Sequence, residues 1–385
     1  MISGRVQDIK PFIVMDVLEK AQAMERAGTS IIHLEVGEPD FDTPACIRDA
    51  AHQALDRGDT HYTHSLGIPE LRQAIAQHYQ NSYGLAPINP ERVIVTMGSS
   101  PAILVALAAI LENGDEVVLS DPHYACYPNF IRFCGGIPRT IPVFEDDGFQ
   151  YRPDDIRKQA ASRTKAIFIN SPANPTGNLL DADRMQAIAD LGKLVLSDEI
   201  YHGLVYEGRA HSIFEFTDHC IVFNGFSKLY AMTGLRLGYL IVPEELVRPV
   251  QKIVQNFFIS ATSVVQWAGY TALTDAGMTE EIHAMLQTYD TRRRFMIRRL
   301  REIGFGIRVD PTGAFYVFAN AGRFTRDSYA FAFEVLEHAH VGITPGIDFG
   351  EHGEGYIRFS YANSLDNISE GLARLERYLA GRSGS

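Results

Sequence analysis

The sequence is poor in cysteine and tryptophan, with four residues of the first and one of the second among 385. The cysteines show neither the paired spacing of a metal site nor a disulfide framework, which fits a reducing compartment. We expect each to be a small buried hydrophobic residue: Cys46, Cys126, Cys134 and Cys220. Two histidine pairs also lack acidic or sulfur partners at ligand spacing, so no metal site is predicted: His61 and His64, and His338 and His340.

Long apolar runs are missing as well. No window reaches the length of uninterrupted apolar sequence that a bilayer-spanning helix needs. The first ten residues show neither the apolar core nor the cleavage-like end of a secretory leader. We therefore expect a cytoplasmic protein that does not associate with membranes.

Positive charge is in deficit, since 35 lysines and arginines stand against 47 aspartates and glutamates, a formal net charge of -12. Such a balance favours solubility and argues against a nucleic-acid-binding surface. The one dense basic stretch, residues 292–301, interleaves Phe295, Ile297 and Leu300 at roughly helical spacing. It predicts an amphipathic helix with a solvated basic face.

Hydrophobic residues are plentiful at 46%, enough to form the core of two or three domains. Near-continuous apolar runs alternate with helical stretches from about residue 87 to residue 243, which is typical of strands covered on both faces in a mostly parallel sheet. The expected strands are Val93–Thr96, Glu116–Ser120, Ala166–Asn170, Leu194–Ser197, Ile221–Asn224 and Leu237–Val242. After about Asp290 strands mix with helices, which predicts a smaller α+β domain.

The most informative segment follows the fifth of these runs. Lys228 stands on the turn after the strand, and Arg236 lies eight residues further on. A lysine can form an imine with an aldehyde, and a nearby arginine can hold a phosphate on the same molecule, so the pair suggests a pyridoxal phosphate (PLP) site. The alternative is that Lys228 is an ordinary surface lysine.

Three other predicted strands end in residues that such a cofactor would need. Asp198 and Tyr201 follow one strand, Asn174 follows another, and the Gly98-Ser99-Ser100 turn follows a third. In an open α/β sheet, ligands collect beyond the carboxyl ends of the strands, so these groups are expected to converge on one crevice. Taken singly, each has a structural alternative, such as a cap for Asp198 or a turn former for Asn174.

Together these motifs resemble those of the class I/II aminotransferases, the fold type I PLP enzymes of the aspartate aminotransferase kind. The likeness runs from about Val36 to Tyr361, with the motifs in the family's order: Val36-Gly-Glu-Pro-Asp-Phe41, His61-Tyr-Thr-His-Ser-Leu-Gly67, the Gly98 turn, Asp121-Pro-His-Tyr-Ala-Cys-Tyr127, Ser171-Pro-Ala-Asn-Pro-Thr-Gly177, Ser197-Asp-Glu-Ile-Tyr201, Phe226-Ser-Lys228 and Tyr356-Ile-Arg-Phe-Ser360. The resemblance implies a large PLP-binding α/β domain over residues 44–289 and a small domain formed by residues 1–43 and 290–385.

The resemblance also implies roles for the residues at the strand ends. Lys228 would hold PLP as an imine and then move a proton at the substrate α-carbon. Asp198 would bond the pyridine nitrogen and keep it protonated. Tyr201 and Asn174 would approach the phenolic oxygen of the ring. Tyr124 would stack on the ring face, although a purely structural aromatic is the alternative at that position.

The phosphate is expected at the start of the helix after Gly98, where backbone N–H groups make an anion site. The resemblance assigns it to Ser99, Ser100, Ser227 and Arg236, with Tyr62 contributed by the partner subunit of a homodimer. Many family members carry a further phosphate-binding serine or threonine where this chain has Gly225. We therefore expect one side-chain contact to be absent, with a water or backbone group in its place.

Substrate recognition is expected from Arg358, which alternates with apolar residues along its predicted strand. Its planar fork suits a carboxylate, and the family position makes this a better assignment than an exposed arginine on an edge strand. Gly37 and Asn174 would complete the pocket. Some aspartate-handling relatives carry a lysine just after the Gly98 turn, where this chain has Ser100 and Pro101, so neutral or aromatic amino acids are the expected donors.

The expected activity is therefore a ping-pong transfer of an amino group from an L-amino acid to a 2-oxo acid. Two alternatives remain open from the sequence. One is another PLP reaction on the same scaffold, such as carbon–sulfur β-elimination or a cyclopropane-forming synthesis, because it uses the same lysine, aspartate and arginines. The remote one is a non-catalytic PLP-binding regulatory module, which would need a DNA-binding segment that the sequence does not show.

Overall fold

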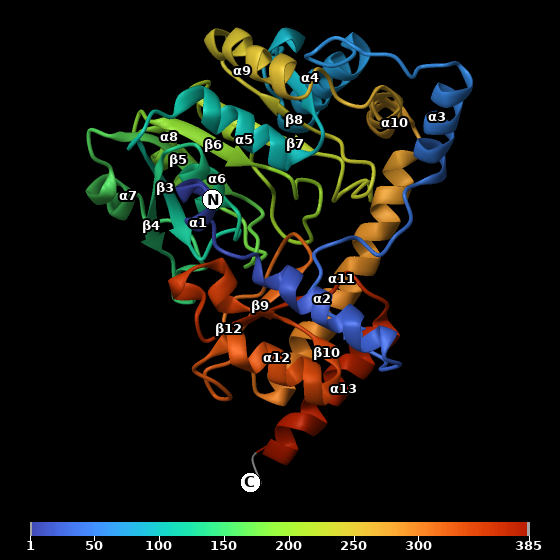
Figure 1. Ribbon diagram of the computed structural model, residues 1–385, viewed down its shortest axis with the longest axis vertical. Coiled ribbons are helices and arrows are strands. Elements are labelled where there is room, and N and C mark those ends of the chain that lie inside the picture. Colours follow the sequence, from blue (N-terminus) through green and yellow to red (C-terminus); the bar gives the residue numbers. More distant parts are fainter. Residues whose placement is uncertain (1, 383–385) are drawn as a thin grey trace.

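The computed structural model describes residues 2–382 and divides into a larger and a smaller body, the upper and lower halves of Figure 1. The larger body is built on a seven-stranded sheet with the order β2-β8-β7-β6-β5-β3-β4. Its strands are β2 (Val93–Thr96), β3 (Glu116–Asp121), β4 (Ile137–Pro142), β5 (Thr164–Asn170), β6 (Leu194–Asp198), β7 (Cys220–Gly225) and β8 (Gly238–Ile241). Only β8 runs against its neighbours, so the expected mostly parallel sheet is confirmed.

Helices cover both faces of this sheet, as the unbroken apolar strands require. They are α3 (Ala45–Asp56), α4 (Pro69–Tyr83), α5 (Ser99–Ile110), α6 (Tyr127–Phe133), α7 (Pro153–Gln159), α8 (Ala182–Ala189), α9 (Glu244–Phe257) and α10 (Ser263–Thr274). Successive residues of β6 point to opposite cores, since Val195 packs with side chains of α4, α8 and α10 and Leu196 with those of α5, α6 and α9. The sheet is thus buried on both sides.

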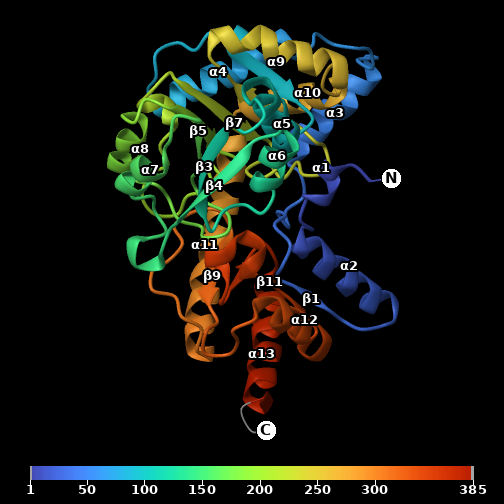
Figure 2. The ribbon, with the colours of Figure 1, turned by 60° about the vertical axis from the view of Figure 1, so that its left-hand side comes forward.

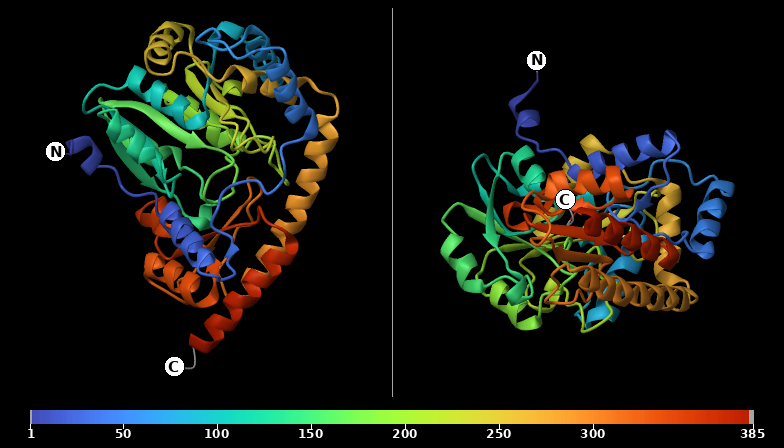
Figure 3. Two further views of the ribbon diagram at one scale, coloured as in Figure 1. Left: turned by 45° about the vertical axis from the view of Figure 1, so that its right-hand side comes forward. Right: turned by 90° about the horizontal axis from the view of Figure 1, so that it is seen from below.

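The smaller body holds two small sheets, β1-β10 and β11-β12-β9. Its elements are α2 (Ile13–Arg26), β1 (Ile32–His33), β9 (Tyr316–Asn320), α12 (Ser328–Ala339), β10 (Val341–Gly342), β11 (Thr344–Pro345), β12 (Tyr356–Ser360) and α13 (Leu365–Arg382). This confirms the expected α+β character. Figure 2 shows α2 beside this body, and both views of Figure 3 show the preceding chain with α1 (Gly4–Gln7) extending outward to the N-terminus. Short 3-10 turns complete the fold at Pro90–Arg92, Glu145–Asp147, Ile213–Glu215, Gly346–Phe349 and Glu351–Gly353.

One long helix, α11 (Met278–Ile303), runs along both bodies. It passes unbroken through residues 289 and 290, where the sequence places the domain boundary, so that boundary stays a prediction. Within the segment before residue 43, α2 packs against α12, β10 and β11 of the smaller body, whereas α1 and Lys10 contact α6 of the larger body. No helix within residues 2–382 is both long and apolar enough to cross a bilayer.

The basic stretch in α11 differs in part from its prediction. Arg292 donates to Asp40 at 2.7 Å, and Arg293 is 1% exposed and donates to the Pro311 carbonyl at 2.7 Å. These two arginines are therefore covered by neighbouring loops, and only the later part of the stretch has a solvated face. The cysteines differ as well, because Cys220 alone is fully buried and the other three are partly exposed, although all four thiols are free.

Candidate functional site

The carboxyl ends of the parallel strands meet a cavity of about 310 Å³ between the two bodies. Most of the residues singled out in the sequence line it: Gly37, Ser99, Ser100, Tyr124, Asn174, Asp198, Tyr201, Ser227, Lys228, Arg236 and Arg358. They come from the ends of five strands of the large sheet (β2, β3, β5, β6 and β7), from the turn before β8, from β12 of the smaller body and from the segment after β1. The predicted convergence of these groups on one crevice is therefore found in the structure.

Lys228 lies in the turn after β7 and is half-buried in the cavity wall. Its Nζ donates to the Gly37 carbonyl oxygen at 2.6 Å. Burial, together with the positive charges of Arg358 and Arg236, lowers the pKa of the Lys228 amine to about 8. About a tenth of this amine is thus neutral near pH 7, compared with far less for an ordinary lysine, and the neutral form is what a nucleophile or a proton-transfer group requires.

Asp198 ends β6 and is 4% exposed. Its Oδ2 accepts a hydrogen bond from the Tyr127 hydroxyl at 2.6 Å, and its Oδ1 accepts one from the Ile200 amide at 3.1 Å. Burial raises the pKa of Asp198 to about 6, against the opposing effects of these two donors and of Lys228. A carboxylate offers about four acceptor positions, so Asp198 has capacity left for a donor in the cavity.

Arg358 projects from β12 into the same cavity. Its guanidinium lies between two rings, with its central carbon 4.3 Å from the centroid of Tyr316 and 4.9 Å from that of Phe349. Stacking of this kind fixes the plane of the guanidinium. The side chain is 2% exposed, so the alternative of an exposed edge-strand arginine is wrong.

The hydrogen bonds of Arg358 use three of its five N–H donors and leave two without a partner, one on Nη1 and the one on Nε. Nη1 donates to Asn174 Oδ1 at 2.9 Å, and Nη2 donates to the Glu35 carbonyl at 2.6 Å and to Thr344 Oγ1 at 3.2 Å. Nε is buried and has no partner. A buried donor without an acceptor is costly, which is an indication that a ligand group pairs with it.

The amino end of α5 forms the opposite end of the cavity. Gly98 precedes this helix with φ 103, and a Cβ there would lie 2.5 Å from Nη2 of Arg236. Only glycine therefore allows the guanidinium to pack over the helix start. Arg236 donates through Nη1 to the Thr233 carbonyl at 2.7 Å. Backbone N–H groups and a guanidinium thus face one place, an arrangement suited to an anion.

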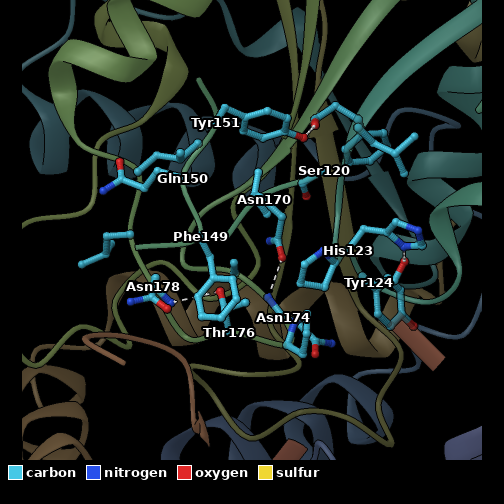
Figure 4. A pocket seen from close by; sticks show the side chains of 18 of the residues that line it. Ser120, His123, Tyr124, Phe149, Gln150, Tyr151, Asn170, Asn174, Thr176 and Asn178 are labelled. Atoms are coloured by element: carbon cyan, nitrogen blue, oxygen red, sulfur yellow. Dashed lines mark hydrogen bonds between the residues drawn. The ribbon is translucent and has the colours of Figure 1, made fainter. Parts of the chain in front are cut away.

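A small second cavity of about 30 Å³ shares Tyr124 and Asn174 with the first (Figure 4). Asn170 lines both cavities. Its Oδ1 accepts from the Asn174 amide at 2.8 Å, and its Nδ2 donates to the Asp198 carbonyl at 2.9 Å. Asn170 therefore ties together two strand ends of the site, whereas the small cavity has room only for about a water molecule.

Several lining residues were not predicted from the sequence. Tyr316 on β9 places its hydroxyl 2.8 Å from that of Tyr201. Tyr127 was noted only as part of a motif, yet its hydroxyl reaches Asp198. The amino end of α2 adds an apolar wall formed by Phe12, Val14, Met15 and Leu18. Hydrophobic pattern alone does not separate such side chains from the core, because the same residue types fill both.

Comparison with known proteins places the chain in a family. A model of the class I and II aminotransferases matches residues 29–375. A (5-formylfuran-3-yl)methyl phosphate transaminase of Methanocaldococcus jannaschii is 43% identical, over 98% of this chain and 100% of that protein. An aspartate aminotransferase of Pyrococcus horikoshii is 38% identical, over 99% of this chain and 97% of that protein.

Comparison with solved structures gives the same family. A solved structure of a Methanococcus jannaschii protein, described as similar in its active site to kynurenine aminotransferases, superposes with a TM-score of 0.91 at 42% identity, covering 98% of this chain and 100% of that one. The chain belongs to the class I and II aminotransferases. It is accordingly a PLP-dependent aminotransferase with the fold type I architecture that the sequence predicted.

The cavity of this aminotransferase fits its cofactor. A half-buried lysine with a lowered pKa can bind an aldehyde, the start of α5 beside Arg236 suits a phosphate, and the free acceptor positions of Asp198 suit a protonated ring nitrogen. The orphaned Nε of Arg358 suits a substrate carboxylate. Within residues 2–382, no group of three or more His, Cys, Asp or Glu side chains is placed to hold a metal ion.

Gly98 and Tyr62 are the predicted site residues that do not line the cavity, and Gly225 lies outside it as well. Tyr62 is 82% exposed and does not line the cavity of its own chain. Gly225 lines a separate cavity, and a Cβ there would lie 2.9 Å from the Leu237 carbonyl and 3.0 Å from the Gly238 Cα. The close approach of β8 therefore leaves little room for a serine or threonine side chain at this position.

Proposed function

We propose that this aminotransferase moves the amino group of a neutral or aromatic L-amino acid to a 2-oxo acid in a ping-pong cycle that uses Lys228 and Asp198. One observation carries the proposal: the Lys228 amine and the Asp198 carboxylate open into the same cavity, and the substrate candidate Arg358 opens there too. When bound, PLP supplies a ring that withdraws electrons from the substrate α-carbon.

Lys228 is assigned the proton transfer at the α-carbon. The neutral fraction of its amine takes the proton, and the same amine first anchors the cofactor aldehyde. Asp198 holds a proton on the ring nitrogen. Asn174 keeps its amide group free to donate to the phenolic oxygen, because its Oδ1 is occupied by Arg358, and Tyr201 approaches the same oxygen beside Tyr316.

Arg358 is assigned the α-carboxylate of the substrate. Its Nε has no partner in the protein, and stacking between Tyr316 and Phe349 holds the fork in place. Gly37 lies opposite, where a Cβ would lie 2.1 Å from the Tyr316 hydroxyl. A larger residue at position 37 would therefore disturb the pocket in which the carboxylate is held.

The apolar wall at the amino end of α2 supports a neutral or aromatic substrate side chain. Phe12 meets Tyr124 edge to face at 6.0 Å, and Met15 and Leu18 continue the same surface. Ser100, rather than a lysine, stands at the start of α5. A second carboxylate would meet apolar groups here and lose its hydration without compensation.

A donor panel tests this preference. Aspartate, alanine, leucine and phenylalanine are each mixed with the loaded enzyme, and the loss of the lysine-bound cofactor absorbance is followed. We expect phenylalanine or leucine to react at least about tenfold faster than aspartate, in line with one unpaired charge in an apolar site. An overwhelming preference for aspartate would contradict the proposal. Release of pyruvate and ammonia from cystathionine without an oxo acid would indicate a β-lyase instead.

The acceptor has a second candidate. The relative named (5-formylfuran-3-yl)methyl phosphate transaminase is 43% identical to this chain over nearly its full length. An aldehyde of that kind has no α-carboxylate, so Arg358 would serve only the donor. Regeneration of the enzyme by (5-formylfuran-3-yl)methyl phosphate is compared with regeneration by 2-oxoglutarate. A faster reaction with the aldehyde, insensitive to Arg358→Lys, would favour this second candidate.

We also infer a homodimer that places Tyr62 of one subunit at the phosphate of the other, and a cytoplasmic location. Large apolar side chains are exposed beside Tyr62, namely Phe257 (75%) and Ile259 (47%). The two segments are neighbours, because Ser263 Oγ donates to the Asp59 carbonyl at 2.7 Å. Exposed apolar groups of this kind favour an interface. Sedimentation of the purified protein as a monomer would contradict the dimer.

A further inference from the structure

We propose that Tyr127 is a positioning residue. Through its hydrogen bond to Asp198 it keeps the proton that Asp198 and the cofactor ring nitrogen share on the nitrogen. The inference depends on the proposed role of Asp198 as the partner of that nitrogen, and it adds a residue whose effect passes through the Asp198 carboxylate. Tyr127 belongs to neither the lysine nor the phosphate end of the site.

The hydroxyl of Tyr127 is aimed at Asp198 by packing. Tyr127 opens α6 and is 2% exposed. Its ring stacks on Phe168 with centroids 4.1 Å apart, and Tyr124 meets it edge to face at 5.2 Å. With the ring held on two sides, the hydroxyl stays 2.6 Å from Asp198 Oδ2. In the described part of the chain, no other side chain donates to this carboxylate.

A donor at this place favours the charged form of the carboxylate. Burial makes ionisation of Asp198 unfavourable, and the Tyr127 hydrogen bond is the largest of the effects that oppose burial and lower its pKa. A carboxylate that already accepts a short, charge-assisted bond is a weaker base towards a second proton. The shared proton therefore stays on the ring nitrogen, where it strengthens electron withdrawal. Without the hydroxyl the proton moves towards Asp198.

The competing explanation is that Tyr127 only fills the core. Tyr127→Phe separates the two explanations because it keeps the ring on Phe168 and removes only the hydroxyl. Tyr151→Phe is the matched control, since Tyr151 is 4% exposed and its hydroxyl donates to the Phe168 carbonyl at 2.6 Å without contacting Asp198. Both variants lose one buried hydrogen bond beside the same phenylalanine.

The test is nitrogen NMR of the holoenzyme loaded with PLP that is isotope-labelled at the ring nitrogen. The chemical shift of that nitrogen reports directly whether it carries a proton. We expect the protonated shift in the wild type and in Tyr151→Phe, and a displacement towards the unprotonated shift in Tyr127→Phe. An unchanged shift in Tyr127→Phe would overturn the inference. If that variant fails to retain PLP, Tyr127→His keeps a donor and must still show the protonated shift.

A kinetic readout accompanies the spectrum. Removing a hydrogen bond to a charged group costs enough to slow the first half-reaction roughly tenfold, with a larger isotope effect from α-deuterated substrate. Equal isotope effects in Tyr127→Phe and the wild type would count against the inference. Asp198→Asn is the reference for the proposed function: if even that variant keeps the protonated shift, Asp198 is not the nitrogen's partner. If Tyr127→Phe keeps the protonated shift and Asp198→Asn loses it, the inference about Tyr127 fails and the role of Asp198 stands.

Discussion

Asp198 and Glu199 are neighbouring buried carboxylates that face opposite sides of the end of β6. Asp198 opens into the cavity with two donors bound, from Tyr127 and Ile200. Glu199 points to the other side and is 1% exposed. Its two oxygens accept hydrogen bonds from Ser197, Ser212 and Ile213 at Oε1 and from Tyr79 at Oε2.

The comparison shows that burial and a raised pKa do not identify a functional carboxylate. Burial raises the pKa of Asp198 to about 6 and that of Glu199 to about 7. The two carboxylates differ in their free hydrogen-bond acceptor positions. Asp198 has free positions that face the cavity, whereas the oxygens of Glu199 are already bonded to donors of the protein. Glu199 holds the loop at Ser212 against the strand and is therefore a structural residue.

The largest effect is expected at Lys228, which is assigned two chemical roles in the cavity. Lys228→Ala removes both the anchor and the proton-transfer base, so we expect turnover to fall at least roughly 10⁴-fold. The phosphate and ring contacts can still hold PLP without a covalent bond. Turnover of the purified variant is measured with the preferred donor, and a rate near that of the wild type would remove Lys228 from the mechanism.

The paired carboxylates give the next largest effect. Asp198→Asn should lower kcat/KM by about 10² to 10³-fold, because the ring nitrogen loses its charged partner. Glu199→Gln should leave kcat within about threefold but lower the free energy of unfolding by about 1–3 kcal/mol, since one buried hydrogen bond becomes mismatched. Steady-state kinetics and urea unfolding of both variants check this. A loss of activity in Glu199→Gln with little change in Asp198→Asn would contradict the roles assigned to the two carboxylates.

Two buried arginines extend the comparison to cations. Arg358 lines the cavity and has an Nε without a partner, whereas Arg293 is bonded to Asp290, Glu207 and the Pro311 carbonyl. Arg358→Lys should raise the KM for the amino acid about 10 to 100-fold, because a lysine cannot pair bidentately with a carboxylate. Arg293→Lys should lower thermal stability and leave KM unchanged. Equal changes in KM would contradict the assignment.

The last effect concerns the dependence of stability on pH. The folded pKa of Glu199, about 7, lies above its ordinary value of 4.5, so its stabilising contribution is complete below pH 4.5 and is lost as the pH rises through 7. The slope is on the order of 1.4 kcal/mol per pH unit within that window. Urea unfolding of the apoprotein between pH 5 and 7.5 should therefore show a shallower slope in Glu199→Gln than in the wild type.

Much of the fold follows from apolar pattern. The run 93–96 matches β2, and the other five predicted strands differ from the observed ones by one or two residues at their ends. The edge strand β4 escaped prediction because Pro138, Arg139 and Pro142 interrupt any apolar run. The reversed direction of β8 escaped as well, since a strand buried on both faces looks the same in either orientation.

The site residues also fall into those that could be predicted from the sequence and those that could not. Lys228, Asp198 and Arg358 could be predicted because each is a charged residue beside or within an apolar run, at a position that matches a family motif. Tyr127, Asn170 and Tyr316 could not, because their roles depend on contacts with strand ends far away in the sequence. The apolar wall from α2 also escaped, since Phe12 and Met15 look like ordinary core residues in the sequence.

Covalent trapping of the cofactor tests the central claim most directly. The PLP-loaded protein is reduced with borohydride, which fixes an imine as a stable amine, and is then digested and analysed by mass spectrometry. The account predicts that the phosphopyridoxyl group is found on the peptide that contains Lys228, at that residue. A group attached to a different lysine, or an unmodified Lys228 in protein that still transaminates, would contradict it.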